Sequence, residues 1–266
     1  MAFIEHNAGG LIYMSSTLIP VPHAFTTRYG GVSRGYLASL NLGANRGDEE
    51  AALRENYTRL AALMGVGPDD MAITKQVHGK EVRIVTDADR HKLFTVTPYE
   101  ADGIATAQRG LPLVCLTADC VPVLLCDAEH GVAAAVHCGW KSSVADILGE
   151  AMSRMQTLGA EPGCVTAALG PAIGRCCFET DDDVPQAVTK YLDGDTEGLF
   201  DRRADGKTMV DLRAANARRL IRLGVPAEQI DISQECTFCS HEKYWSHRYT
   251  KGQRGSQGAV ICLPEE

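Results

Sequence analysis

Residues 113–141 constrain the fold more than any other stretch, because two apolar segments there each carry a soft metal ligand. Segment 113–126 is apolar and β-branched enough for a buried strand, and segment 131–137 predicts a second strand after a short hairpin loop. Cys120 lies late in the first segment and His137 ends the second. If the two strands pair, the thiol and the imidazole can converge.

The second strand leads directly into a predicted helix. Apolar residues recur at helical spacing from 142 to 158, and Gly159 follows as the stop. The free N–H groups and positive end of such a helix would lie beside His137, which suits an anion such as phosphate. Pro122 removes a ladder donor, so we expect a strand end, an edge or a bulge near Cys120.

Composition narrows the class of protein. The 266 residues are 45% hydrophobic and 23% charged, as in soluble globular proteins, and we expect one domain over 1–266 because no repeat or linker appears. A net charge of −8 argues against a nucleic-acid partner. The sequence has neither a signal-peptide pattern nor an uncharged apolar window of about 18 residues, so we expect a cytoplasmic protein with no membrane partner. Its ten cysteines are then expected to be reduced core, metal-binding or catalytic thiols.

Helical and strand patterns alternate along the rest of the chain, which predicts an α/β fold with mixed sheets. Further helices are expected at 48–64, 181–193 and 211–223. Hairpins are expected within 1–22 and 71–85, and single strands at 23–28, 99–106, 165–170, 230–233 and 258–263. Residues 195–206 are expected to form a surface excursion.

One Cys-x-x-Cys pair, Cys236 and Cys239, has the spacing of half a structural zinc site. No second such pair follows it, and the adjacent Cys176 and Cys177 are not expected to chelate together. A structural zinc site there is therefore the minor hypothesis.

One thiol and two imidazoles remain as the main candidates, namely His78, Cys120 and His137. Three protein ligands leave the fourth position of tetrahedral zinc open, which is typical of a catalytic site. The same residues allow a metal-free alternative, in which Cys120 is the nucleophile and His137 the base. Spacing alone does not choose between them.

A series of short motifs resembles the YfiH/YlmD family of laccase-domain proteins, in the family's order: FTTRYGGVS with SLNLG, QVHGKEV, ADG, TADCVPVLL, HCGWK, LGPAIG, and CT followed by SHR. The resemblance implies a single α/β domain of YfiH-like fold, related to the cytotoxic-necrotizing-factor cysteine hydrolases. It implies zinc bound by His78, Cys120 and His137, which would be the catalytic residues. It also implies purine nucleoside phosphorylase activity on adenosine, inosine and methylthioadenosine, with accompanying adenosine deaminase activity.

The expected partners are therefore a purine nucleoside and phosphate. Our candidates for binding them are Arg28, Asn41, Lys75, Gln76, Lys141 and Arg248. Lys141 and Cys138 depart from the family pattern, which usually has an arginine and a small residue there. A lysine keeps a positive charge for phosphate but loses the bidentate fork. Cys138 would point away from His137 into the core, and Asp119 is expected to be structural or to support Cys120.

Two alternatives stay open. The first is a cysteine or zinc amidohydrolase that edits peptidoglycan precursors. The second is a copper polyphenol oxidase, which the older family name suggests. Copper is disfavoured because a three-ligand site lacks the repeated His-x-His pairs of a multicopper cluster, and copper can occupy zinc sites adventitiously. The sequence indicates no oligomeric state.

Overall fold

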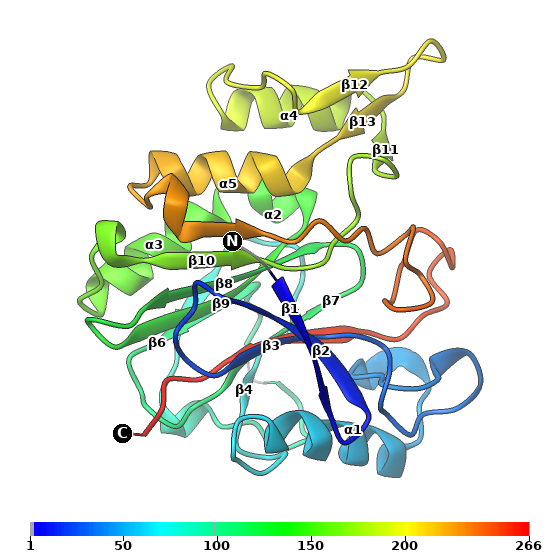
Figure 1. Cartoon of the computed structure of the whole chain (residues 1–266), viewed down its shortest axis with the longest axis vertical. Helices are drawn as coiled ribbons and strands as arrows, with labels where there is room; N and C mark the ends of the chain where they lie inside the picture. The colour runs from blue at the N-terminus through cyan, green and yellow to red at the C-terminus, as the bar shows by residue number, and fades with distance from the viewer. Residues whose placement is uncertain (1–2, 98, 266) are drawn as a thin grey trace.

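The computed structural model describes residues 3–97 and 99–265, and its centre consists of two six-stranded sheets (Figure 1). The first sheet contains, in spatial order, β1 (Phe3–Ala8), β2 (Leu11–Ser16), β3 (His23–Thr26), β15 (Gln257–Ile261), β7 (Leu113–Thr117) and β4 (Ala72–Ile73). The second contains β14 (Ile230–Ile232), β10 (Thr166–Leu169), β8 (Val121–Asp127), β9 (Val132–Cys138), β6 (Gly103–Thr106) and β5 (Val82–Ile84).

Helices cover the outer faces of both sheets. On the first sheet lies α1 (Glu50–Ala62); over the second lie α2 (Trp140–Val144), α3 (Ile147–Thr157) and α5 (Leu212–Arg222). Beyond α5 are α4 (Asp183–Tyr191) and a small sheet of β11 (Glu179–Thr180), β13 (Thr208–Val210) and β12 (Phe200–Arg202). Short 3-10 helices lie at Gly35–Leu37, Ala44–Arg46, Asp87–Asp89, Pro162–Cys164 and Ala227–Gln229.

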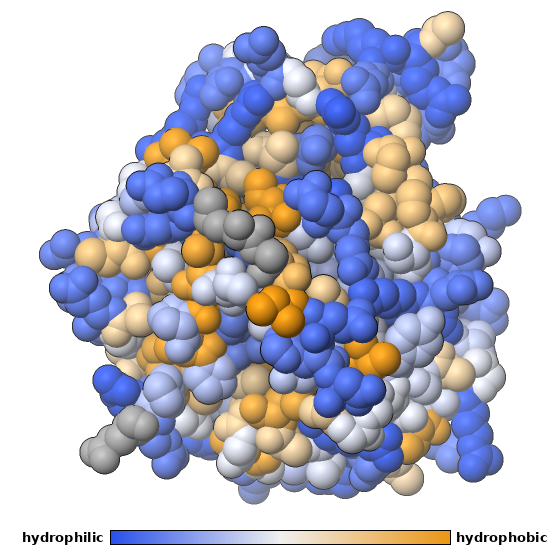
Figure 2. All heavy atoms as spheres, viewed as in Figure 1, coloured by the Kyte–Doolittle hydropathy of each residue, from blue (hydrophilic) through white to orange (hydrophobic). Residues whose placement is uncertain are grey.

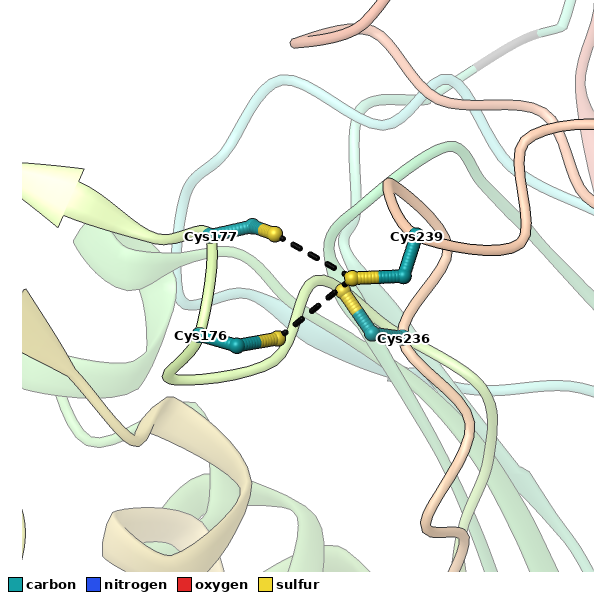
Figure 3. A group of neighbouring side chains, drawn as sticks. All are labelled: Cys176, Cys177, Cys236 and Cys239. Carbon is teal, nitrogen blue, oxygen red and sulfur yellow. Dashed lines mark hydrogen bonds between the residues drawn. The ribbon is translucent and has the colours of Figure 1, made fainter.

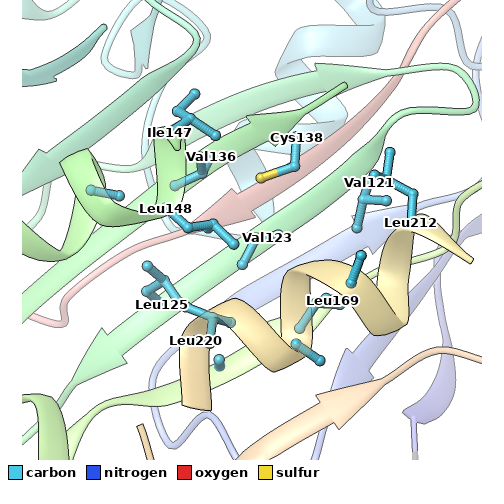
Figure 4. Packing of buried hydrophobic residues seen from close by; sticks show 14 of the residues in the cluster. Val121, Val123, Leu125, Val136, Cys138, Ile147, Leu148, Leu169, Leu212 and Leu220 are labelled. Carbon is cyan, nitrogen blue, oxygen red and sulfur yellow. The ribbon is translucent and has the colours of Figure 1, made fainter. Parts of the chain in front are cut away.

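The alternation of β8 explains why the layers stack in this order. Leu124 and Cys126 face the first sheet, whereas Val123 and Leu125 face the helices, because successive strand side chains point to opposite faces. Both faces are buried, so the strand is apolar from Val121 to Cys126 and ends at the buried Asp127. Figure 4 shows the helix-side cluster, in which Cys138 lies among valines and leucines; its prediction as a core residue is confirmed.

The prediction of one strand over 113–126 is wrong. Residues 113–117 form β7 in the first sheet, and β8 belongs to the second. The chain crosses between the sheets at residues 118–120, where Asp119 adopts a φ of 85°. Both strands are buried, so their composition gives no sign of the crossing. The expected hairpin of β8 and β9 is confirmed, and Pro122 lies one residue before the pairing of β8 with β10 begins.

The hairpin predicted at 71–85 is also wrong. β4 pairs with β7 in the first sheet, and β5 pairs with β6 in the second. The segment between them is a second crossing between the sheets. The predicted surface excursion at 195–206 contains the short strand β12.

The single helix predicted at 142–158 is broken into α2 and α3. Asp146 interrupts it with a φ of 67°, and its carboxylate accepts a hydrogen bond from the backbone N–H of Gly149. Arg219 holds the same carboxylate through its Nε, at 2.8 Å. The other helices and the opening hairpin are confirmed within a few residues.

Hydrophilic side chains cover the end of the molecule formed by α4 and the β12–β13 hairpin (Figure 2). Ion pairs such as Arg203 with Glu179 and Lys207 with Asp181 cross this small sheet. Charges of this kind discourage pairing of its edge with other chains. Within the described residues, no helix is both long enough and apolar enough to cross a bilayer.

Candidate active site

The structure brings His78, Cys120 and His137 together between the two sheets. His78 lies in the crossing from β4 to β5, Cys120 in the crossing from β7 to β8, and His137 near the end of β9. One ligand atom from each lies within 4.8 Å of the others. The Cys120 Sγ is 3.8 Å from the His78 Nε2, and the two imidazole rings meet edge to face.

Asp102 supports both histidines, although the sequence analysis assigned it no role. Its Oδ1 is 2.8 Å from the His137 Nδ1, so the His137 Nε2 is left free to face the site. The same carboxylate accepts hydrogen bonds from the backbone N–H groups of Val77, His78 and Gly79. The only signal in the sequence was the ADG motif, which marks the start of β6.

These three N–H bonds hold the His78 loop in a demanding shape. His78 itself has a φ of 61°, a left-handed conformation that is uncommon for residues other than glycine. On the β7 side, the Gln76 amide exchanges two hydrogen bonds with the backbone of Leu116, as a strand neighbour would. Gln76 therefore anchors the loop that carries His78.

Gly139 leaves the space in which the side chains of His78 and Cys120 meet. A Cβ at this position would lie 2.8 Å from the His78 Cδ2 and 3.3 Å from the Cys120 Sγ. Its φ of −70° is open to any residue, so space and not backbone conformation requires glycine here.

The three side chains perturb one another electrostatically. Burial raises the pKa of the Cys120 thiol, but the neighbouring His137 and His78 outweigh burial and hold this pKa at about 6. Burial lowers the pKa of His137, but the Cys120 thiolate and the Asp102 carboxylate raise it to about 9. The thiol is thus prepared to be a thiolate, the form that binds metals or acts as a nucleophile.

A cavity of about 1140 Å³ opens onto this group. Of the six predicted binding residues, Lys75, Gln76 and Arg248 line it, and Arg28, Asn41 and Lys141 are not among its lining residues. Lys75 is engaged by Glu100 in an exposed ion pair at 2.8 Å.

Arg28 and Asn41 have structural contacts instead. The Arg28 guanidinium lies 3.9 Å over the Trp245 ring and donates to the carbonyl oxygen of Ala38. The buried Asn41 side chain bonds both the N–H and the carbonyl of Gly43, which begins the cavity-lining segment 43–46. Asn41 thus holds the backbone of a cavity-lining segment without lining the cavity itself.

Lys141 is exposed on α2, with its Nζ 5.7 Å from the centre of the Trp140 ring. The expected anion site at this helix start has a weaker basis than the sequence suggested, because α2 has only five residues. A role for Lys141 in phosphate binding stays a prediction.

Basic residues that the sequence analysis missed line another wall of the cavity: Arg46, His247 and Arg254. Burial, and then the charge of Arg46, lowers the pKa of Arg254 to about 10, and burial and Arg254 lower the pKa of His247. These groups are therefore close enough to repel one another, and a bound anion would relieve the repulsion. Arg46 and Arg254 are distant in sequence, and only the fold reveals the cluster.

Asp119 connects this wall to the segment that carries Cys120. This position agrees with the structural role expected for Asp119. Its carboxylate accepts a hydrogen bond from the Thr237 hydroxyl and another from the Arg248 N–H, both at 2.6 Å. Its carbonyl oxygen accepts the N–H of Ile173. Three cavity segments therefore meet beside Cys120.

A family model described as multi-copper polyphenol oxidoreductase laccase matches residues 22–264. The chain belongs to this family. A solved structure of YlmD from Geobacillus stearothermophilus superimposes with a TM-score of 0.91 at 30% identity, covering 98% of each chain. These findings confirm the resemblance to YfiH and YlmD and the mixed α/β fold.

Two relatives of this family member carry the names of purine enzymes. The chain is 37% identical over 247 residues to "Purine nucleoside phosphorylase Cgl2154/cg2365" of Corynebacterium glutamicum, covering 93% of this chain and 96% of the relative. It is 33% identical over 231 residues to "Adenosine deaminase RL5" of an unknown prokaryotic organism, covering 85% and 87%.

Proposed function

We propose that this protein is a zinc-dependent purine nucleoside phosphorylase that acts on adenosine, inosine and methylthioadenosine, with accompanying adenosine deaminase activity. The observation that carries the proposal is one cavity that contains both the His78, Cys120 and His137 group and a cluster of cationic side chains. The names of the two relatives support a purine substrate.

The donor set fits zinc. Two imidazole nitrogens and a thiolate are ligands that zinc prefers, and three of them leave one position open. Gly139 provides the room, and the bond from His137 Nδ1 to Asp102 directs Nε2 toward the site. Zinc bound there would act as a Lewis acid in the cavity.

Phosphorolysis requires phosphate to be held against C1′ of the ribose while positive charge develops on the sugar and negative charge on the purine. We assign phosphate to Arg46 and Arg254 of that cluster together with Arg248, whose charges would hold the dianion and orient its attacking oxygen. The planar purine has apolar walls available at Phe178 and Trp140.

A cysteine amidohydrolase is the second candidate, because Cys120, His137 and Asp102 form a thiol, imidazole and carboxylate chain. In that enzyme the Cys120 thiolate would attack a carbonyl carbon, and His137 would protonate the leaving amine. This second proposal includes a fold related to the cysteine hydrolases and peptidoglycan precursors as the substrates.

A multicopper oxidase has less support, despite the family's description. In the part of the chain that the structure describes, the groups placed to bind a metal are this three-residue set and a group of four cysteines. Neither contains the array of histidines that a multicopper cluster needs. We propose a cytoplasmic location, which the ten free cysteines support.

The test is release of free base from inosine and adenosine, with and without phosphate, by protein of measured metal content. We expect release that depends on phosphate, stops on chelation and returns with Zn²⁺. Cys120→Ser should abolish it, and Cys164→Ser, which changes a cysteine outside the cavity, should not. Hydrolysis of amides that survives chelation but not Cys120→Ser would favour the amidohydrolase.

A further inference from the structure

Four cysteines from two distant segments meet near the surface, outside the cavity (Figure 3). Cys176 and Cys177 lie in the loop between β10 and β11, and Cys236 and Cys239 follow β14. The Cys239 Sγ is 3.7 Å from the Cys176 Sγ and 3.4 Å from the Cys177 Sγ. All four sulfur atoms lie within 4.8 Å of one another.

These distances match coordination of a single ion. A zinc–sulfur bond is about 2.3 Å, so neighbouring sulfurs of a zinc tetrahedron are about 3.8 Å apart. A disulfide requires about 2.0 Å and would use only two of the four thiols. A four-iron cluster would need more space between its ligands than this group leaves.

The loop 174–178 brings the two adjacent cysteines to the same place, although the sequence did not lead us to expect them to chelate together. The N–H groups of Cys177 and Phe178 both donate to the carbonyl oxygen of Gly174, so the backbone turns tightly here. In a strand, neighbouring side chains would point to opposite faces. In this turn, both thiols approach Cys239 (Figure 3).

Gly174 permits the close approach of the two segments. A Cβ there would lie 3.3 Å from the Cys176 Sγ and 3.3 Å from the Cys236 Cβ. Its N–H donates to the Cys236 Sγ at 3.2 Å. Such an N–H bond satisfies a buried sulfur and favours its charged form.

We propose that Cys176, Cys177, Cys236 and Cys239 form a second metal site, which binds one Zn²⁺ as a tetrathiolate. Four thiolates in a tetrahedron are typical of zinc, and they leave no position open for a substrate. The site is therefore structural. Binding releases the thiol protons to solvent, so zinc affinity falls as the solution becomes more acidic.

The ion would fasten two walls of the catalytic cavity. The loop that carries Cys176 and Cys177 also contributes Ile173 and Phe178 to the cavity lining. The segment after Cys236 contributes Arg248. Zinc at this junction would hold the apolar wall against the cationic wall. It would reinforce the isolated β-bridge between Ala172 and Cys236, which already joins the two segments there.

The experiment uses the full chain with Cys120→Ser, which removes a ligand of the proposed catalytic site and leaves the four-cysteine site intact. We expect about one zinc per chain, and zinc-edge X-ray absorption should show four sulfur neighbours at about 2.3 Å. Adding Cys239→Ser should remove this zinc and lower Tm by several degrees. Cys164→Ser, in place of Cys239→Ser, should change neither.

The proposal would be overturned if Cys120→Ser protein contained no zinc after preparation with zinc present and without chelator. So would a disulfide between any two of the four cysteines in protein purified under reducing conditions, or iron in place of zinc. Because Cys120→Ser isolates the second site, failure of the nucleoside assay has no bearing on this result. Cys176→Ser, which changes another exposed thiol, should repeat the loss seen with Cys239→Ser.

Discussion

Gly139 sets the strictest requirement at the scale of single residues, because its missing side chain is the space between His78 and Cys120. We expect Gly139→Ala to displace the His78 ring, to reduce zinc at this site and to lower kcat/KM on the order of 100-fold. The free energy of unfolding should change little, since a φ of −70° suits alanine. Metal analysis, nucleoside assays and urea unfolding measure these three quantities.

Gly163→Ala is the matched control for Gly139→Ala, because no atom lies within 4 Å of the Cβ it would add. It should leave zinc content and activity unchanged. Full activity in Gly139→Ala would mean that His78 is not held where the structure has it.

Residue type and position near strand ends or turns made His78, Cys120 and His137 candidates, and the resemblance to YfiH and YlmD implied that they bind zinc together. The structure brings the three side chains together. Asp102 and Arg254 could not be found in this way. Their roles depend on contacts across the fold, and a carboxylate before a strand or an arginine in a loop is ordinary in sequence. The approach of four thiols could not be predicted from spacing either, because it depends on the tight turn at Gly174 that brings Cys176 and Cys177 to Cys239.

At the scale of elements, the break between α2 and α3 depends on Asp146. Asp146→Ala should lower the free energy of unfolding by about 2 kcal/mol, because alanine loses the cap to Gly149 and is strained at a φ of 67°. Asp146→Asn keeps an oxygen for the cap, and asparagine tolerates this backbone conformation. It loses only the partly exposed ion pair with Arg219, so its free energy of unfolding should fall by less than about 1 kcal/mol. Urea unfolding compares the two, and equal losses would contradict this account.

Periodicity predicted most of the helices and most strands of the two large sheets, since apolar spacing reflects which face is buried. It did not predict the small sheet of β11, β12 and β13. It did not predict which strands pair. Two of the predicted units, 71–85 and 113–126, cross from one sheet to the other, and buried strands on either side of a crossing have the same composition. Each crossing contains one of the candidate metal ligands, His78 in one and Cys120 in the other.

At the scale of the whole molecule, buried carboxylates make stability depend on pH. Burial raises the pKa of Asp127, but the N–H groups of Glu161 and His130 and the His130 ring hold it below its usual value. Its contribution is therefore complete above the unfolded pKa of about 3.8 and is lost as pH falls through the lower folded value. We expect urea midpoints to fall more steeply in wild type than in Asp127→Asn between about pH 5 and pH 3. Parallel curves would exclude Asp127 as a source of this acid sensitivity.

The position of β15 has a consequence for biosynthesis. This strand, residues 257–261, lies between β3 and β7 and pairs with both, so the first sheet stays divided until the ribosome has made it. Until then the nascent chain exposes two apolar strand edges, which are prone to pair with other chains. His78 and Cys120 both lie where the chain leaves this sheet, so we expect the candidate site to form only after those five residues have been made. Protection by chaperones during translation would therefore matter more for this protein than for one whose sheets are completed in the order of synthesis.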